Sequence, residues 1–229
     1  MIIEHTPFCD IVQLVRQRIP FTFSRWGDGE WRAVLGKLGG VNCDGHQFYP
    51  QMGEELRQVL ISKPTYLLGM QPMALRIYEK PINEFLAKHG LQDLKWLNAD
   101  VIHSASIHDN LGLLISAMRG RLLVMVGPDQ LKRVSPQLQY QHFVEVPPRN
   151  CYLALDRIVH DVLNILESQK EHTIVSVSAS MPAEIILDRL YKRIGTRHTL
   201  IDFGSVWDPF VGVYSRSYMK AKLRRANPR

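Results

Sequence analysis

The chain has 229 residues, of which 45% are hydrophobic, and its formal net charge is +6 at pH 7. This length fits a single α/β domain, and the hydrophobic content excludes a globally disordered chain. The sequence has no run of about 18 apolar residues, and its start lacks a basic region followed by an apolar core, so we expect neither a spanning helix nor a secretory signal. Three widely spaced cysteines favour buried thiols over disulfides or a zinc site, and we expect a cytoplasmic protein.

The first half of the chain alternates between amphipathic and apolar segments. Apolar residues at helical spacing predict helices over residues 10–19, 51–61 and 74–89, and a further helically spaced segment covers residues 31–38. Short apolar runs predict strands over residues 21–24 and 65–69. Residues 91–110 show no clear period, so the sequence predicts no element there.

The second half of the chain is more regular. It predicts strands over residues 122–126, 143–146, 172–178 and 199–203, and helices over residues 152–167 and 182–194, with a short helix after residue 129. Strands that alternate with helices in this way indicate a Rossmann-like α/β fold, with a mostly parallel sheet and helices on both faces. We expect one catalytic domain over residues 1–213, followed by a basic tail over residues 214–229.

The segment around residue 28 is the strongest candidate for a functional site. An apolar run ends at Arg25, and the string Gly27-Asp28-Gly29-Glu30 follows as a predicted turn. Ligand sites of open α/β sheets lie at such carboxyl ends of strands. Two carboxylates two residues apart can face one Mg²⁺ or Mn²⁺ ion, the glycines allow a phosphate to approach the backbone, and Arg25 offers a fork of donors. The alternative is a polar turn with a surface ion pair.

Other polar residues follow the later predicted strands. Gly127 begins a turn that could place a phosphate at a helix start, although an ordinary strand–helix turn also explains it. Ser178 and Ser180 could contact a nucleotide or simply cap a helix. Asp202 and Asp208 are candidates for a general base or an acceptor-binding group, with Asp202 also suited to fixing the final turn. Parallel strands would bring all of these residues to the edge that carries Asp28 and Glu30.

The end of the chain carries the whole excess of positive charge. Residues 214–229 contain no acid, and aromatic Tyr214 and Tyr218 alternate with cations there. This pattern fits a solvated tail, an anchor to anionic lipid or a nucleic-acid contact. For the nucleic-acid interpretation the candidate residues are Arg216, Lys220, Lys222, Arg224 and Arg225.

The motif at residues 25–30 resembles the Arg-(aromatic)-Gly-Asp-Gly-Glu signature of the GT-D fold glycosyltransferases, once catalogued as a domain of unknown function. The Val-Pro-Pro-Arg-Asn stretch at 146–150 and the Asp-Phe-Gly ending at 202–204 are similar to later parts of that family. Residues 178–183 depart from its Gly-Pro-Thr-Ala-like turn. The resemblance implies the GT-D fold and a metal-assisted transfer from a nucleotide sugar, with UDP as the expected carrier and Asp28 and Glu30 matching the Asp-x-Glu motif.

These patterns leave three classes of function open. The first is a metal-dependent hexosyltransferase, whose acceptor is a hydroxymethylated base in DNA or, alternatively, a cell-surface glycan or glycoprotein. The second is a metal-dependent nuclease or phosphodiesterase, which would also need clustered acids and a basic surface. The third is a nucleotide-binding module without catalysis. The sequence does not specify an oligomeric state.

Overall fold

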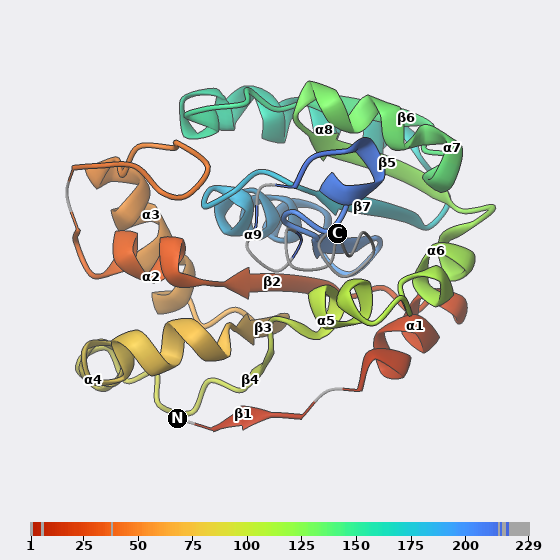
Figure 1. Cartoon of the computed structure of the whole chain (residues 1–229). Helices are drawn as coiled ribbons and strands as arrows, with labels where there is room; N and C mark the ends of the chain where they lie inside the picture. Colours follow the sequence, from red (N-terminus) through yellow and green to blue (C-terminus); the bar gives the residue numbers. More distant parts are fainter. Residues whose placement is uncertain (1, 6, 38, 215, 217–218, 220–229) are drawn as a thin grey trace, which may run out of the picture.

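A single parallel sheet organises the protein. The computed structural model describes residues 2–5, 7–37, 39–214, 216 and 219 (Figure 1). Its eight strands lie in the order β1-β4-β3-β2-β8-β7-β5-β6, and all pairings between them are parallel. The strands are β1 Ile3–Glu4, β2 Thr22–Trp26, β3 Leu67–Met70, β4 Trp96–Asn98, β5 Leu122–Gly127, β6 His142–Glu145, β7 Thr173–Val177 and β8 Thr199–Asp202.

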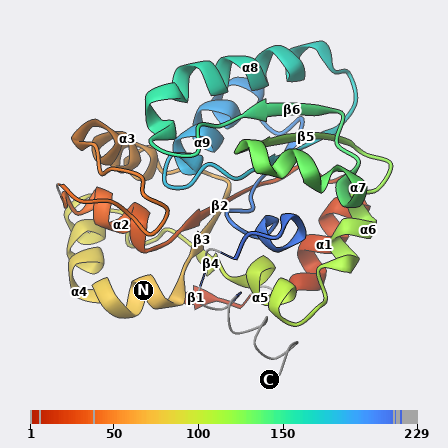
Figure 2. The ribbon, with the colours of Figure 1, turned by 45° about the horizontal axis from the view of Figure 1, so that its top comes forward.

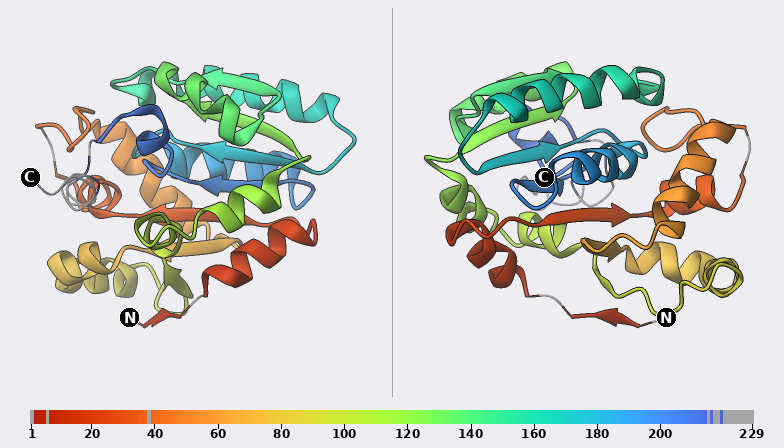
Figure 3. Two further views of the ribbon diagram at one scale, coloured as in Figure 1. Left: turned by 45° about the vertical axis from the view of Figure 1, so that its right-hand side comes forward. Right: turned by 180° about the vertical axis from the view of Figure 1, so that it is seen from behind.

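Helices cover both faces of this sheet, which confirms the predicted α/β architecture. One face carries α2 Asp28–Val34, α3 Pro50–Ile61, α4 Pro72–Lys88, α8 Leu155–Ser168 and α9 Ala183–Ile194. The other face carries α1 Phe8–Arg16, α5 Val101–Ile107, α6 Gly112–Met118, α7 Ser135–Leu138 and the 3₁₀ helices η1 Asp129–Val134 and η3 Asp208–Val211. A third 3₁₀ helix, η2 Cys151–Ala154, precedes α8. Figures 2 and 3 show α1 beside α6 and α8 beside α9.

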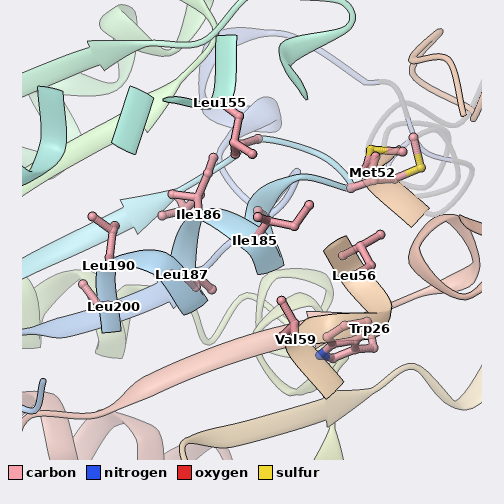
Figure 4. Close-up of a cluster of buried hydrophobic side chains, with 14 of the residues drawn as sticks. Trp26, Met52, Leu56, Val59, Leu155, Ile185, Ile186, Leu187, Leu190 and Leu200 are labelled. Carbon is pink, nitrogen blue, oxygen red and sulfur yellow. The ribbon is translucent and has the colours of Figure 1, made fainter. Parts of the chain in front are cut away.

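The two faces bury separate hydrophobic clusters, because alternate residues of a strand point to opposite sides. In β5, Val124 and Val126 join the cluster under α8 and α9, whereas Leu123 and Met125 join the cluster under α1 and α6. Figure 4 shows part of the first cluster, in which Ile185 of α9 faces Leu56 of α3, and Val59 of α3 lies beside Trp26 of β2. Among the described residues, no helix has the length and apolar character needed to cross a bilayer.

The structure differs from the sequence expectation in the segments with the least local pattern. Residues 91–110 contain β4 and α5, and neither β1 nor α6 is predicted from the sequence. The Gly-Asp-Gly-Glu string is not a turn, because α2 begins at Asp28 and Gly27 is its N-cap in an extended conformation. The side chain of Glu30 accepts a hydrogen bond from the backbone N–H of Gly27, with 2.8 Å between Oε2 and N. This capping interaction starts the helix earlier than the apolar spacing indicates.

We expect Gly53→Ala to destabilise the fold by about 1–3 kcal/mol, because α2 and α3 pack closely at this position. A Cβ atom on Gly53 would lie 2.5 Å from the backbone carbonyl oxygen of Ala33, which is too close for any real contact. Gly112→Ala in α6 is the matched control, since a Cβ there meets nothing within 4 Å. Urea unfolding should show a loss of stability only for Gly53→Ala, and equal effects of the two substitutions would contradict this packing argument.

Candidate functional site

A cleft of about 450 Å³ opens at the carboxyl ends of four neighbouring strands. The loop that follows each of β5, β6, β7 and β8 contributes to its wall. The chain passes from β5 to β6, which pairs with one side of β5, and then to β7, which pairs with the other side of β5. Ligands of open α/β sheets bind where the strand order reverses in this way. The lining residues include Pro128, residues 146–149, residues 178–180, Gly204, Ser205 and Asp208, together with residues 43–46 and Arg216.

The loop of residues 42–46, between α2 and α3, is tied across the cleft by side-chain hydrogen bonds. Asn42 Oδ1 accepts the backbone N–H groups of Asp44 at 3.0 Å and His46 at 2.9 Å, which folds the loop on itself. Asn42 Nδ2 donates to Ser180 Oγ at 2.9 Å, after the end of β7. Ser180 Oγ in turn donates to Asp44 Oδ2 at 3.5 Å. The loop is therefore anchored to the sheet edge through Ser180, a predicted donor-binding residue.

Arg216 connects this loop to the segment after β8. Its Nη2 lies 2.6 Å from Asp44 Oδ2, its Nη1 donates to Cys43 Sγ, and its Nε donates to Ser205 Oγ at 3.4 Å. Burial opposes the charge on Arg216, but the charge of Asp44, its hydrogen bond to the guanidinium and the interactions with Cys43 together outweigh burial and raise the pKa of Arg216. The structure thus places this predicted nucleic-acid residue in the cleft wall. The other four candidates, Lys220, Lys222, Arg224 and Arg225, lie outside the described residues.

The acidic start of α2 lies beside the cleft rather than in its wall. Asp28 is exposed, and its charge acts on Cys43, which lines the cleft. Glu30 is turned back toward Gly27, and burial raises the pKa of its carboxyl to about 7, with a smaller contribution from the charge of Asp202. Gly29 packs closely against Met181, because a Cβ atom at position 29 would lie 3.0 Å from Cγ of Met181. The two carboxylates of the motif therefore have different surroundings.

Beneath the cleft, Arg25 joins the ends of three strands. Its Nε donates to the Ala99 carbonyl oxygen at 2.9 Å, and its Nη1 lies 3.5 Å from Asp202 Oδ2. Its Nη2 lies 3.9 Å from Asp100 Oδ1, and the Arg25 side chain is 12% exposed. Asp202 Oδ1 also accepts the backbone N–H of Gly204 at 2.8 Å. The predicted phosphate ligand Arg25 and the candidate base Asp202 are thus engaged with each other and with the backbone.

Glu184, in the first turn of α9, completes a buried acidic group that the sequence analysis missed. It is fully buried, and its Oε1 accepts the backbone N–H of Arg25 at 3.0 Å. Burial, followed by the charges of Asp202 and Glu30, raises the pKa of Glu184 well above its ordinary value. Burial also raises the pKa of Asp202, although the charge of Arg25 opposes this shift. An acid between apolar residues at the start of a helix after a strand is the signal that could have indicated it.

The remaining predicted residues take different positions. Ser178 lines the cleft, and its buried Oγ has no hydrogen-bond partner among the described residues. Ser180 also lines the cleft and has a positive φ of 52°, which is uncommon for a residue other than glycine. Asp208 lines the cleft at the start of η3. Gly127 ends β5, where its carbonyl oxygen accepts the backbone N–H of Val146 at 2.9 Å.

The residues present fit a metal ion that is shared with a ligand, rather than one enclosed by protein. Within residues 2–5, 7–37, 39–214, 216 and 219, no three His, Cys, Asp or Glu side chains are grouped closely enough to hold a metal ion. Mg²⁺ is often held by one or two carboxylates together with substrate phosphates. Asp28 is exposed and fits that role, whereas Glu30 already accepts the N–H of Gly27 with its Oε2 atom.

Comparison with known proteins identifies the fold. No family model matches the chain, and no curated protein matches it in sequence. Two solved structures match over 91% of this chain and 80% of their own, each with a TM-score of 0.64 and 15% sequence identity. One is described as "The highly conserved domain of unknown function 1792 has a distinct glycosyltransferase fold", and the other is the selenomethionine-substituted structure of that domain. The protein has the glycosyltransferase fold seen in domain of unknown function 1792.

Proposed function

We propose that the protein is a glycosyltransferase that moves a hexose from a nucleotide sugar, with UDP as carrier, to an acceptor hydroxyl. The observation that carries this proposal is the cleft at the carboxyl ends of β5 to β8, beside the acidic start of α2, within a glycosyltransferase fold. The reaction breaks the bond between the anomeric carbon and the diphosphate oxygen. It forms a bond from that carbon to the acceptor oxygen, and it releases a nucleoside diphosphate and a proton.

In this proposal the position of each residue in or below the cleft gives it a different role. Ser178 and Ser180 are placed to contact the donor, because both line the cleft after β7. Asp208 also lines the cleft and is the proposed base that accepts the proton of the acceptor hydroxyl. Asp202 and Arg25 lie beneath and hold the strand ends in place. Asp202 therefore acts as a positioning residue rather than as the base.

A divalent cation, Mn²⁺ or Mg²⁺, is part of the proposal. When bound, such an ion neutralises charge on the departing diphosphate. Asp28 would hold it together with the donor phosphates, because its carboxylate is exposed beside the cleft. Glu30 would either join as a second ligand or keep the first turn of α2 in place through its hydrogen bond with Gly27.

For the acceptor we propose a hydroxymethylated base in DNA. The support is the concentration of positive charge in residues 214–229, which suits a phosphate backbone. Of the cations there, Arg216 is paired with Asp44 in the cleft. The DNA contacts would therefore come from the cations beyond it in the sequence, and a glycan or glycoprotein acceptor is the competing outcome.

A donor screen tests this proposal. The protein is incubated with nucleotide sugars, with and without Mn²⁺, and released nucleotide is detected by mass spectrometry. We expect slow, metal-dependent hydrolysis of a UDP-sugar, and faster release when hydroxymethylated duplex DNA is added. Cleavage of DNA without release of UDP from the sugar donor would indicate a nuclease. Binding of the nucleotide sugar without release of UDP would indicate a module without catalysis. Transfer to a saccharide, but not to DNA, would replace the proposed acceptor with a glycan.

A further inference from the structure

Arg216 and Asp44 form an ion pair in the wall of the cleft, where the Asp44 carboxylate binds the guanidinium as an anionic ligand could. Both side chains are about three-quarters buried, with exposed fractions of 27% and 23%. Nη2 of Arg216 lies 2.6 Å from Asp44 Oδ2, and the same guanidinium also donates to Cys43 Sγ and Ser205 Oγ. Each of the three guanidinium nitrogens of Arg216 therefore donates a hydrogen bond to a residue of the protein itself.

An arginine in such a cleft is suited to a phosphate group. The planar guanidinium presents several N–H donors in a fixed fork that matches the oxygens of phosphate as well as those of carboxylate. Asp44 supplies a carboxylate oxygen to this fork, so a phosphate oxygen of a ligand would compete with Asp44 for the same donors. Because both partners line the cleft, the exchange needs no rearrangement of the sheet.

The surroundings of the ion pair also point to an anionic ligand. Arg149 lines the same cleft and lies beside the loop, since a Cβ atom on Gly45 would be 3.6 Å from its Nε. Ser178 Oγ is buried in the cleft wall without a hydrogen-bond partner among the described residues. Two arginines thus line one cavity of about 450 Å³, together with a serine whose hydroxyl has no partner in the part of the chain that the structure describes. This volume is within the range of small-molecule sites.

We propose that Arg216 is a diphosphate-binding residue of the cleft, and that Asp44 holds it in an autoinhibitory ion pair until an anionic ligand displaces the carboxylate. The inference rests on the proposed function only for the choice of a diphosphate as ligand. The loop that carries Asp44 is held by Asn42, whose side chain bonds to Ser180 after β7. Displacement therefore breaks the Arg216–Asp44 contact and leaves the Asn42 anchor in place.

Binding of inorganic pyrophosphate to the full chain, measured by calorimetry without divalent metal, tests this proposal. Asp44→Asn should lower the dissociation constant of pyrophosphate about threefold to tenfold, the range expected from releasing a partly buried ion pair. Arg216→Gln should raise it. In the Arg216→Gln background, Asp44→Asn should tighten binding less than in the wild type, because it then removes only the repulsion between the carboxylate and pyrophosphate and releases no guanidinium. Asp161→Asn, which removes an exposed ion pair with Arg157 on α8, is the matched control and should change nothing.

Three results would overturn the proposal. They are unchanged or weaker pyrophosphate binding by Asp44→Asn, an equal tightening in the Arg216→Gln background, and no binding by any variant. Asp44→Ser removes the carboxylate by a second route if Asp44→Asn fails to fold. Donor hydrolysis, measured in parallel, separates this inference from the proposed function. If the wild type and all variants fail to hydrolyse the nucleotide sugar but show the expected pattern of pyrophosphate binding, only the proposed function is contradicted. If they hydrolyse the nucleotide sugar but bind pyrophosphate equally well with and without Asp44, only this inference is contradicted.

Discussion

Asp28→Asn should lower nucleotide-sugar turnover by about 10²-fold or more while leaving the melting temperature nearly unchanged. One well-placed electrostatic group typically contributes that much to a reaction in which charge develops on a leaving group. Asp28 is exposed at the first residue of α2, so its amide replacement disturbs no packing and removes only a small interaction with the helix dipole. Turnover is measured as release of nucleotide at saturating Mn²⁺.

Glu30→Gln separates the two roles open to the second carboxylate. Its amide oxygen can still accept the N–H of Gly27, so the start of α2 should persist. If Glu30 is a metal ligand, turnover should fall as it does in Asp28→Asn, and the apparent affinity for Mn²⁺ should weaken. Asp161→Asn on α8 is the charge-matched control. Full activity of both Asp28→Asn and Glu30→Gln with metal present would place the site elsewhere.

Glu30→Gln should also become more stable relative to the wild type as pH rises from 5 to 8 in metal-free buffer. Burial raises the pKa of Glu30 from 4.5 to about 7, so the folded state holds a proton that the unfolded state has released over this interval. The contribution of protonated Glu30 to the stability of the wild type is therefore fully present below about pH 4.5, and it is lost as pH rises through about 7. The upper limit of the change is about 3 kcal/mol.

Denaturant unfolding of both proteins at several pH values measures this difference. Burial lowers the pKa of His103 and His46, which favours stability at higher pH, but these histidines are in both proteins and their effect cancels. Glu184→Gln should change in the same direction, because the pKa of Glu184 is also raised by burial. Glu84→Gln, on the exposed face of α4, is the control. A constant difference between Glu30→Gln and wild type would mean that Glu30 is ionised throughout.

Local pattern was sufficient where one element carries its own signal. The long helices over 51–61 and 182–194 and the strand over 122–126 are close to α3, α9 and β5, because each has a clear apolar period. β1, β4 and α5 were not predicted, since two or three strand residues or a seven-residue helix give too short a window for any period. The start of α2 at Asp28 depends on the hydrogen bond from the backbone N–H of Gly27 to the side chain of Glu30. The two glycines in this stretch suggest a turn instead, so the sequence does not indicate this bond.

The candidate site shows the same division. The sequence by itself determined the alternation of strands and helices, and hence that Ser178, Ser180 and Asp208 would meet at one edge of a parallel sheet. Only the tertiary structure decided which partners each group has. Glu184 bonds to Arg25 across 159 positions of the chain, and Arg216 pairs with Asp44 across 172. Such contacts follow from the order of the strands and from packing between layers. Periodicity along the chain does not specify strand order or layer packing, because it reports only which face of an element is buried.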